Sequence, residues 1–450
     1  MKVLIANDTY PPDVNGAAYF TKRLAEGLAE RGHEVHVLCP STSRQTEVVE
    51  RSGVVEHRMR SLAVPFHIGF RFSPPPLLYR RVLAEVERIR PDVVHAQGHF
   101  FIGRAVIRAA KELGIPVIAT NHFMPDNLTF YLGLPEGTER RITEWAWRDF
   151  ARVFNRADIV TAPTPFAAEL AEEKGVRGPV LPISCGMDLS RFNPGNDVDA
   201  FKLKHGIPEQ PSFMYVGRLD AEKRVDELTR ALPLVRESVD AQLVIVGDGH
   251  ERRRLVDLAE EEGVEGYVIF TGFVPDEELP GAYAACDVFC NAGVAELQSI
   301  VTLEAMATGK PVVGANASAL PLLVHDGENG HLFEPGDVDT LASRLTEILS
   351  DGDERAEMGE ESLRIVARHD IEETLSAFEE LYELVLPSRS GTAIRADLPA
   401  PASVREGAAS GDTVGVPAPA AASYMLADDT LALSGAGSPQ TSTHKRRTAS

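Results

Sequence analysis

The chain has little cysteine and no excess of positive charge, and each shortage excludes a class of protein. Only four of its 450 residues are cysteine, and none has Cys or His partners at metal-ligand spacing; they are Cys39, Cys185, Cys286 and Cys290. We therefore expect free, buried thiols in a reducing compartment. The formal net charge of −22 argues against nucleic-acid partners, because non-specific binding to nucleic acid needs a positive surface.

Long hydrophobic runs are also lacking. No apolar stretch approaches the ~20 residues of a membrane-spanning helix, and the apolar run after Met1 ends too soon for a signal peptide. Hydrophobic residues make up 44% and charged residues 25%, as in soluble globular proteins, and 450 residues are too many for one ordinary core. We expect a cytoplasmic protein of two or more domains, which a local basic and apolar patch could bring to the inner face of the cell membrane.

Short β-branched runs alternate with amphipathic helical segments along most of the chain. The first expected strands are 3–6, 34–38, 92–95, 116–120 and 158–161, with helices at 17–31, 77–90 and 103–113. A second set of strands comprises 213–216, 242–246, 267–271, 287–290 and 311–314. This βαβα order with strongly apolar strands predicts an α/β protein with two Rossmann-like, doubly wound parallel sheets that face a cleft.

Composition sets the expected domain boundaries. We predict an N-terminal domain over 1–183, a linker over 184–199 and a C-terminal domain over 200–370. The segment 371–387 is expected to form a final helix that ends before Pro387; whether it packs on the first domain is left open. From residue 388 to 450, Ala, Gly, Ser, Pro and Thr dominate without periodicity, which predicts a disordered tail.

The segment from 291 to 313 carries the clearest chemical signal. Its sequence, NAGVAELQSIVTLEAMATGKPVV, places Glu296 and Glu304 around a loop that leads into a helix. A helix N-terminus has free N–H groups and a partial positive charge, so it favours an anion such as a diphosphate. The two carboxylates are suited to accepting hydrogen bonds from sugar or ribose hydroxyls. The pattern therefore indicates a nucleotide-sugar ligand.

Three further motifs follow expected strands. They are VGRLDAEK at 216–223, PDVNGAA at 12–18 and TNHFMPDN at 120–127. In the first, a glycine at the end of a strand allows a tight turn beside a ligand, and Arg218 and Lys223 supply two cations. Together with the paired α/β halves, the four motifs resemble the retaining GT-B glycosyltransferases of family 4, over about residues 1–386.

The resemblance implies that the N-terminal domain is the acceptor side and that the C-terminal domain binds the nucleotide-sugar. It also implies a role for each matching residue. It implies that Glu304 holds the ribose hydroxyls, that Glu296 contacts the transferred sugar near its 3-hydroxyl and that His122 lies beside the reacting sugar carbon. Arg218 and Lys223 would bind the diphosphate and stabilise the charge on the leaving group. The remaining positions implied to bind the donor are Gly16, Gly217, Val274, Gln298, Ser299 and Ile300, with Val274 in the loop that reads the base.

The same resemblance implies that no metal or other cofactor is needed, since the nucleotide-sugar is a co-substrate, and no Asp-x-Asp signature follows the cleft-facing strands. The family usually has Phe-Gly where this chain has Gln298-Ser299, and a Gln there resembles members that glycosylate diacylglycerol. Two aromatic and arginine-rich segments, 64–81 and 140–148, could dock on an anionic membrane surface, although core packing explains them equally well.

We therefore expect a retaining hexosyltransferase that uses a UDP- or GDP-linked sugar and a lipid acceptor such as diacylglycerol or a glycolipid. One alternative is transfer to a soluble acceptor, an inositol phosphate or a growing glycan. A second is a non-catalytic nucleotide-sugar sensor on the same scaffold. The base and sugar of the donor stay open, because backbone groups and shape would read them.

Overall fold

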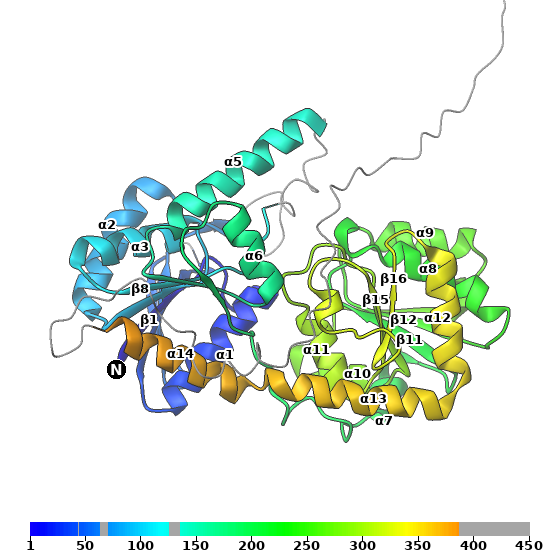
Figure 1. Cartoon of the computed structure of the whole chain (residues 1–450). Helices are drawn as coiled ribbons and strands as arrows, with labels where there is room; N and C mark the ends of the chain where they lie inside the picture. The colour runs from blue at the N-terminus through cyan, green and yellow to red at the C-terminus, as the bar shows by residue number, and fades with distance from the viewer. Residues whose placement is uncertain (44, 64–70, 126–135, 387–450) are drawn as a thin grey trace, which may run out of the picture. The chain divides into compact units, whose positions relative to one another are not determined.

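The computed structural model describes residues 1–43, 45–63, 71–125 and 136–386, all of which belong to one compact unit (Figure 1). Their strands form an eight-stranded sheet in the order β10-β9-β8-β7-β1-β2-β4-β3 and a six-stranded sheet in the order β13-β12-β11-β14-β15-β16. The prediction of two doubly wound sheets is confirmed. The tail expected over 388–450 lies outside the described residues.

The larger sheet is built by the first half of the chain. Its strands are β1 (Lys2–Ala6), β2 (Glu34–Pro40), β3 (Glu47–Arg51), β4 (Val54–Met59), β7 (Val93–Ala96), β8 (Val117–Thr120), β9 (Ile159–Ala162) and β10 (Val180–Pro182). The helices are α1 (Gly16–Glu30), α2 (Pro75–Ile89), α3 (Phe101–Leu113), α5 (Glu136–Phe154) and α6 (Pro165–Glu173), and β5 (Leu62–Ala63) pairs with β6 (Arg71–Phe72). Strands such as β1 and β7 are apolar on both faces because helices cover both sides of a parallel sheet.

One edge of this sheet departs from the expectation. Strand β3 pairs antiparallel with β4, so the sheet is not parallel throughout. The sequence pattern did not predict either strand, because β4 contains Glu56 and Arg58. These two side chains form a buried ion pair at 2.7 Å, and Arg58 also donates a hydrogen bond to the carbonyl of Pro11.

The smaller sheet is parallel at every strand pair. Its strands are β11 (Ser212–Val216), β12 (Gln242–Val246), β13 (Val268–Gly272), β14 (Val288–Asn291), β15 (Val312–Ala315) and β16 (Gly330–Phe333). The helices that follow β10 are α7 (Asp199–His205), α8 (Val225–Arg236), α9 (Arg252–Glu261), α10 (Leu279–Ala284), α11 (Ile300–Ala307), α12 (Val338–Ser350), α13 (Gly352–Val366) and α14 (Ile371–Val385).

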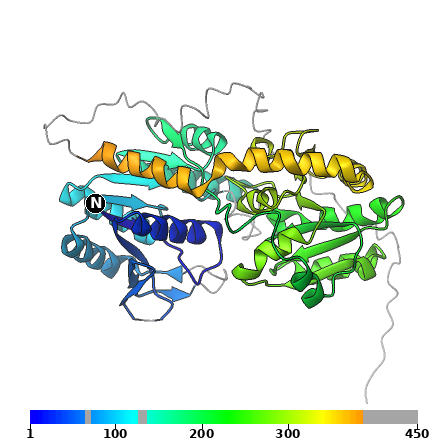
Figure 2. The ribbon, with the colours of Figure 1, turned by 90° about the horizontal axis from the view of Figure 1, so that it is seen from below.

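The last helix packs on the first half of the chain, which the sequence left open. Helix α14 contacts α1 and runs along the first half of the chain (Figure 2). Its Leu375, Phe378 and Tyr382 are buried in the same core cluster as Phe20 and Leu24. Arg31, which caps α1, is ion-paired with Glu372 and Glu379 of α14.

The cysteines and the helices agree with two expectations from composition. All four cysteines are free and buried. None of the helices in the described part of the chain is long and apolar enough to cross a membrane.

Candidate active site

The segment from β14 to α11 forms a loop braced by its own polar side chains. Asn291 accepts a hydrogen bond from Gly293 N at 2.9 Å and donates one to Ser299 Oγ at 2.9 Å. Ser299 occupies the N-cap position of α11 with φ −87°, which any L-residue adopts, and its side chain makes no cap hydrogen bond. Glu304 lies in the second turn of α11, since the helix begins at Ile300. The prediction that the two carboxylates stand at the two ends of the loop is therefore wrong for Glu304, which lies within the helix.

Two of the predicted residues from different motifs meet directly. Lys223 Nζ lies 2.6 Å from Glu296 Oε1, and both side chains are largely buried, at 18% and 13% exposure. The carbonyl of Glu222 accepts a hydrogen bond from Val294 N at 3.3 Å, which holds the two loops together. The ion pair places a cation and a carboxylate side by side, so that a diphosphate and a sugar hydroxyl could bind next to each other.

The loop after β11 requires its glycine. Gly217 has φ +151°, and a Cβ at this position would lie 2.6 Å from the hydroxyl of Tyr215. Arg218 follows, with its side chain 43% exposed and paired with the buried carboxylates of Asp220 and Glu222. These acids are therefore not members of a solvated charged loop; they hold the guanidinium of Arg218 in place.

Glu304 lies in a different environment from Glu296. Its Oε2 accepts a hydrogen bond from the hydroxyl of Tyr283 at 2.6 Å, and the residue is 8% exposed. Burial raises the pKa of the Glu304 carboxyl to about 7, against the hydrogen bond from Tyr283 and the attraction of Arg23, which lower it. The carboxyl therefore titrates near neutral pH.

Two nitrogens of the half-buried Arg23 side chain, on α1, lack an acceptor. Its Nε and Nη2 atoms are buried, and within the described ranges no group accepts a hydrogen bond from them. The charge of Arg23 lowers the pKa of both Glu304 and Cys185, so it acts on this part of the candidate site. Buried donors without an acceptor are costly, so the surroundings of Arg23 favour an anionic ligand.

The turn between β1 and α1 meets the N-terminus of α11. A Cβ at Gly16 would lie 4.0 Å from Ile300 Cγ1. Asn15 is extended, with φ −160°, and it caps α1 by accepting a hydrogen bond from Ala18 N. Gly16 and Ile300 thus lie together at the N-termini of α1 and α11, where free backbone N–H groups could bind an anion.

His122 is held by a buried chain of hydrogen bonds. Its Nε2 lies 2.6 Å from Gln97 Oε1, and because an amide oxygen only accepts, Nε2 carries the proton. Gln97 Nε2 donates to His95 Nε2 at 3.1 Å, and His95 Nδ1 lies 2.7 Å from the hydroxyl of Tyr382 in α14. Burial lowers the pKa of both His122 and His95 to about 3, so both rings are neutral at physiological pH.

Gln298 connects the donor segment to the stretch after β10. Its Oε1 accepts a hydrogen bond from Cys185 N at 2.8 Å, and its Nε2 donates one to Ser184 Oγ at 2.9 Å. Cys185 Sγ in turn lies 3.8 Å from His122 Nδ1. Gln298 and His122 are therefore brought together through Cys185, and both ends of the Gln298 amide already have protein partners.

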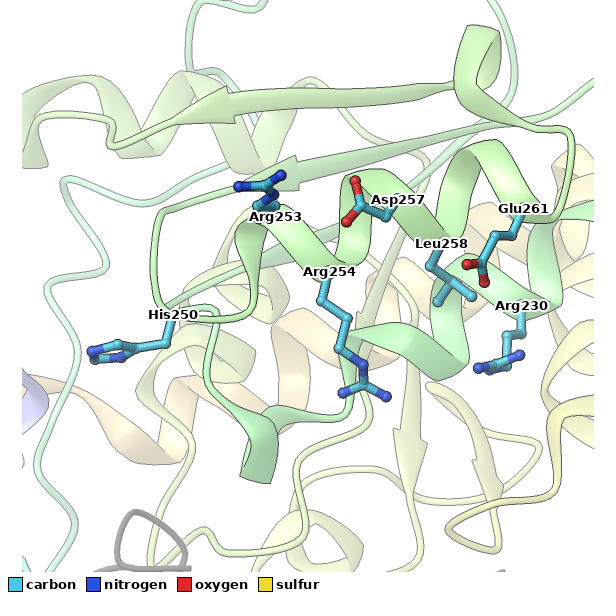
Figure 3. A pocket seen from close by; sticks show the side chains of 7 residues that line it. All are labelled: Arg230, His250, Arg253, Arg254, Asp257, Leu258 and Glu261. Carbon is cyan, nitrogen blue, oxygen red and sulfur yellow. The ribbon is translucent and has the colours of Figure 1, made fainter. Parts of the chain in front are cut away.

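One predicted residue, Val274, and one surface hollow lie apart from the contacts described above. Val274 is 5% exposed, and its side chain packs in a core cluster with Tyr283. A surface hollow of about 460 Å³ lies beside α8 and α9 (Figure 3). It is lined by Arg230 of α8, by His250 in the loop before α9, and by the α9 residues Arg253, Arg254, Asp257, Leu258 and Glu261. None of the predicted donor-binding residues lines it.

The sequence reasoning missed Tyr283, Arg23 and Gln97. Arg23 and Gln97 touch or act on predicted residues from distant positions in the chain, and neither belongs to a motif. Tyr283 lies 21 residues before Glu304. The only signal that could have found Gln97 is its place two residues beyond the expected strand at 92–95, on the side where ligands bind to parallel sheets.

Two family models and several curated relatives match the chain over most of its length. Residues 197–364 match the family model of glycosyl transferases group 1, and residues 14–191 match that of Glycosyltransferase Family 4. The chain is 31% identical over 339 residues to a GDP-mannose-dependent alpha-mannosyltransferase of Mycobacterium tuberculosis, covering 75% of this chain and 85% of that one. It is 26% identical to the alpha-monoglucosyldiacylglycerol synthase of Streptococcus pneumoniae, covering 74% and 75%.

A solved structure shows the same fold. The structure of HepE from Anabaena in complex with UDP-glucose superposes with a TM-score of 0.67 at 20% identity, covering 85% of this chain and 99% of that one. Two doubly wound sheets with a polar site at the β14–α11 segment define a GT-B glycosyltransferase that takes its sugar from a nucleotide-sugar. The chain belongs to glycosyltransferase family 4.

Proposed function

We propose that this protein transfers a hexose from a nucleotide-diphosphate hexose to a hydroxyl group of a membrane lipid, with retention of the anomeric configuration. The observation that carries the proposal is the 2.6 Å ion pair between Lys223 and Glu296. It joins two motifs that lie 73 residues apart, and it supports a site in which Lys223 and Arg218 bind the diphosphate while Glu296 binds the hexose. Glu304 binds the ribose in this proposal.

The proposed reaction breaks the bond between the anomeric carbon and the diphosphate oxygen and forms a bond to the acceptor oxygen on the same face. The acceptor proton passes to the leaving phosphate, so no protein base is required. Arg218, Lys223 and the N-terminus of α11 stabilise the negative charge that develops on the diphosphate. His122, which is neutral at physiological pH, orients the hexose by hydrogen bonding.

A lipid acceptor is supported by one surface and one relative. On α5, Arg141, Trp145 and Arg148 are exposed at the spacing of one helix face, and Trp145 is 62% exposed. A ring flanked by arginines suits the interface of an anionic membrane. Trp147, in contrast, is buried in the core. The predicted segment 64–81 is described only from residue 71, where Arg71 donates hydrogen bonds to Ser61 Oγ and the carbonyl of Thr42.

The lipid relative, the alpha-monoglucosyldiacylglycerol synthase, acts on a diacylglycerol acceptor by its name. The M. tuberculosis relative is GDP-mannose-dependent by its name, so GDP-mannose is the first donor to assay and UDP-glucose the second. The test incubates the full chain with each radiolabelled donor and vesicles of diacylglycerol with anionic phospholipid, and measures label that partitions into the organic phase.

Label in the lipid fraction is the expected result. The triple variant Arg141→Ala, Trp145→Ala, Arg148→Ala should lose about thirtyfold or more of this transfer, since each of the two arginines contributes about 1 kcal/mol near an anionic membrane surface, while donor binding stays unchanged. Leu203→Ala, at a residue 86% exposed on α7, is the control. Label transferred only to an inositol phosphate or glycan would replace the lipid with a soluble acceptor. Donor binding without any product would indicate a sensor.

A further inference from the structure

A second cluster of titratable side chains lies in the C-terminal half and contains none of the active-site candidates. Within the described ranges, one nitrogen of His331 and one carboxylate oxygen each of Glu347 and Glu354 lie within 4.8 Å of one another. The three residues come from β16, α12 and α13 respectively, so the cluster joins the edge strand of the smaller sheet to the two helices that follow it.

His331 is the buried member, and it points into the cluster. The residue is 4% exposed. Its Nε2 is buried and has no hydrogen-bond partner in the described part of the chain; Glu347 Oε2 lies 3.6 Å away, beyond hydrogen-bonding distance. A buried polar atom without a partner is rare and indicates a ligand or ion that completes it.

The other ring nitrogen of His331 is already fixed. Nδ1 lies 3.1 Å from Asp326 Oδ1, which also accepts a hydrogen bond from Leu332 N at 3.0 Å. A carboxylate that accepts the Nδ1 proton leaves the lone pair of Nε2 free and orients the ring. This is the arrangement in which histidine ligands of metal ions are usually held.

The charge of the cluster also suits a cation. Glu347, Glu354 and Asp326 contribute three carboxylates, against which Arg344 is a cation, with its Nη1 3.0 Å from Glu347 Oε2. Glu347 is exposed and Glu354 is half-buried, so an ion could enter from solvent and the two side chains could move to meet it.

We propose that His331 Nε2, Glu347 and Glu354 bind a divalent transition-metal ion, with Asp326 as the group that orients His331. One imidazole and two carboxylates favour Zn²⁺ over Mg²⁺ or Ca²⁺, which prefer oxygen ligands alone. Neighbouring ligands of a tetrahedral Zn²⁺ lie about 3.3 Å apart, so the glutamates need only a small side-chain movement. The ion fastens β16 to α12 and α13; it takes no part in glycosyl transfer.

The test uses untagged full-length protein that has been treated with EDTA and dialysed. Zn²⁺ is titrated by calorimetry, and bound zinc is counted by mass spectrometry after gel filtration. We expect one high-affinity equivalent per chain, a rise in the melting temperature, and tetrahedral absorption bands when Co²⁺ replaces Zn²⁺. Asp326→Asn should weaken binding about tenfold to hundredfold, as is usual for outer partners of a metal ligand.

The double variant Glu347→Gln, Glu354→Gln should lose the high-affinity equivalent and the shift in melting temperature. It changes side chains near the surface, so it keeps the test valid if His331→Gln fails to fold. His325→Gln with Glu328→Gln is the matched control, because this exposed pair (3.4 Å) lies close by in sequence and outside the cluster.

Equal zinc stoichiometry and affinity in the wild type and the Glu347/Glu354 variant would overturn the proposal, as would the absence of tight binding by the wild type. Transferase activity in EDTA is the independent readout. It should be the same for the wild type and the Glu347/Glu354 variant, so failure of the metal site and failure of the proposed transfer reaction remain distinguishable.

Discussion

The two ends of the segment from Glu296 to Glu304 carry the same side chain in different surroundings. Glu296 is ion-paired with Lys223 in the loop, whereas Glu304 is enclosed within α11 and hydrogen-bonded to the neutral hydroxyl of Tyr283. Burial raises the pKa of the Glu304 carboxyl to about 7. The two ends of the candidate donor site therefore differ in their partners: one carboxylate faces a cation, and the other lies next to a neutral hydroxyl and changes charge near neutrality.

The ion-paired end, where Lys223 meets Glu296, should matter most for the rate of hexose transfer. Replacing Lys223 with Ala removes a cation that stabilises the leaving diphosphate, and loss of one such group typically costs about a hundredfold to a thousandfold in kcat. Steady-state transfer of a radiolabelled hexose measures the effect. Lys111→Ala, which breaks the ion pair with Asp158 in the first half of the chain, is the control and should keep the wild-type rate. A Lys223→Ala enzyme with more than half of the wild-type kcat would remove Lys223 from the reacting centre.

Glu304, at the buried end, should determine the affinity for the donor and the pH dependence of that affinity. Glu304→Gln exchanges a charged acceptor for a neutral one, and hydrogen bonds to charged groups contribute about 1.5–3 kcal/mol, so the donor should bind about tenfold to hundredfold more weakly. In the wild type, Kd should rise by up to about tenfold per unit as the pH falls below the pKa of Glu304, about 7. Calorimetry with an intact nucleotide-sugar is suitable, because its diphosphate has no group that titrates there.

The glutamine variant separates Glu304 from other causes of pH dependence. Glu304→Gln should bind the donor with the same affinity at pH 6 and pH 8, whereas Glu361→Gln, on α13, should keep the wild-type profile. If the variant and the wild type lose affinity in parallel on acidification, another group titrates and the contrast between the two carboxylates is wrong.

The same burial predicts a gain in stability for the inactive variant. The folded-state pKa of Glu304, about 7, lies above its ordinary value of 4.5, so the contribution of this group is fully favourable below pH 4.5 and is lost as the pH rises through 7. At pH 8 the charged form costs about 3 kcal/mol by the size of this shift. Denaturant unfolding should show Glu304→Gln to be more stable than the wild type at pH 8, with the difference vanishing near pH 4, below the ordinary pKa of 4.5. Equal differences at both pH values would contradict this.

The smallest effect concerns His122, which belongs to neither end. Gln97→Ala removes the 2.6 Å hydrogen bond that orients the ring, and one such bond contributes about 0.5–1.5 kcal/mol, so kcat should fall about twofold to tenfold with little change in donor KM. Tyr382→Phe, one step further along the chain of hydrogen bonds, should have a weaker effect of the same kind. Unchanged kcat in Gln97→Ala would show that the orientation of His122 does not limit transfer.

Local sequence pattern predicted most strands of the two sheets and the donor segment, because both depend on neighbouring residues; β3, β4, β10 and β16 were not predicted. Buried strands such as β11 and β14 are short apolar runs, and Glu296 and Glu304 stand at a fixed spacing on either side of the start of α11. Strand β4 was missed because the ion pair of Glu56 and Arg58 makes a buried strand look polar.

The rest of the candidate site depends on contacts between distant parts of the chain. Nothing near Glu304 in the sequence indicates that Tyr283 will donate to it, and nothing near Arg23 indicates that two nitrogens of its guanidinium are buried with no acceptor among the residues that the structure describes. Such contacts are made only when the sheets and their helices are assembled, so they leave no spacing that can be read along the chain. The roles of the individual site residues stay predictions.

Helix α14 has a consequence for the order in which the protein can be made. Phe20 and Leu24 near the start of the chain are buried against Leu375, Phe378 and Tyr382 near the end of the described chain. During synthesis, domains generally fold from the N-terminus as the chain emerges. Here the first half cannot close its core until α14 has left the ribosome, so the part of the protein that is translated first is finished last.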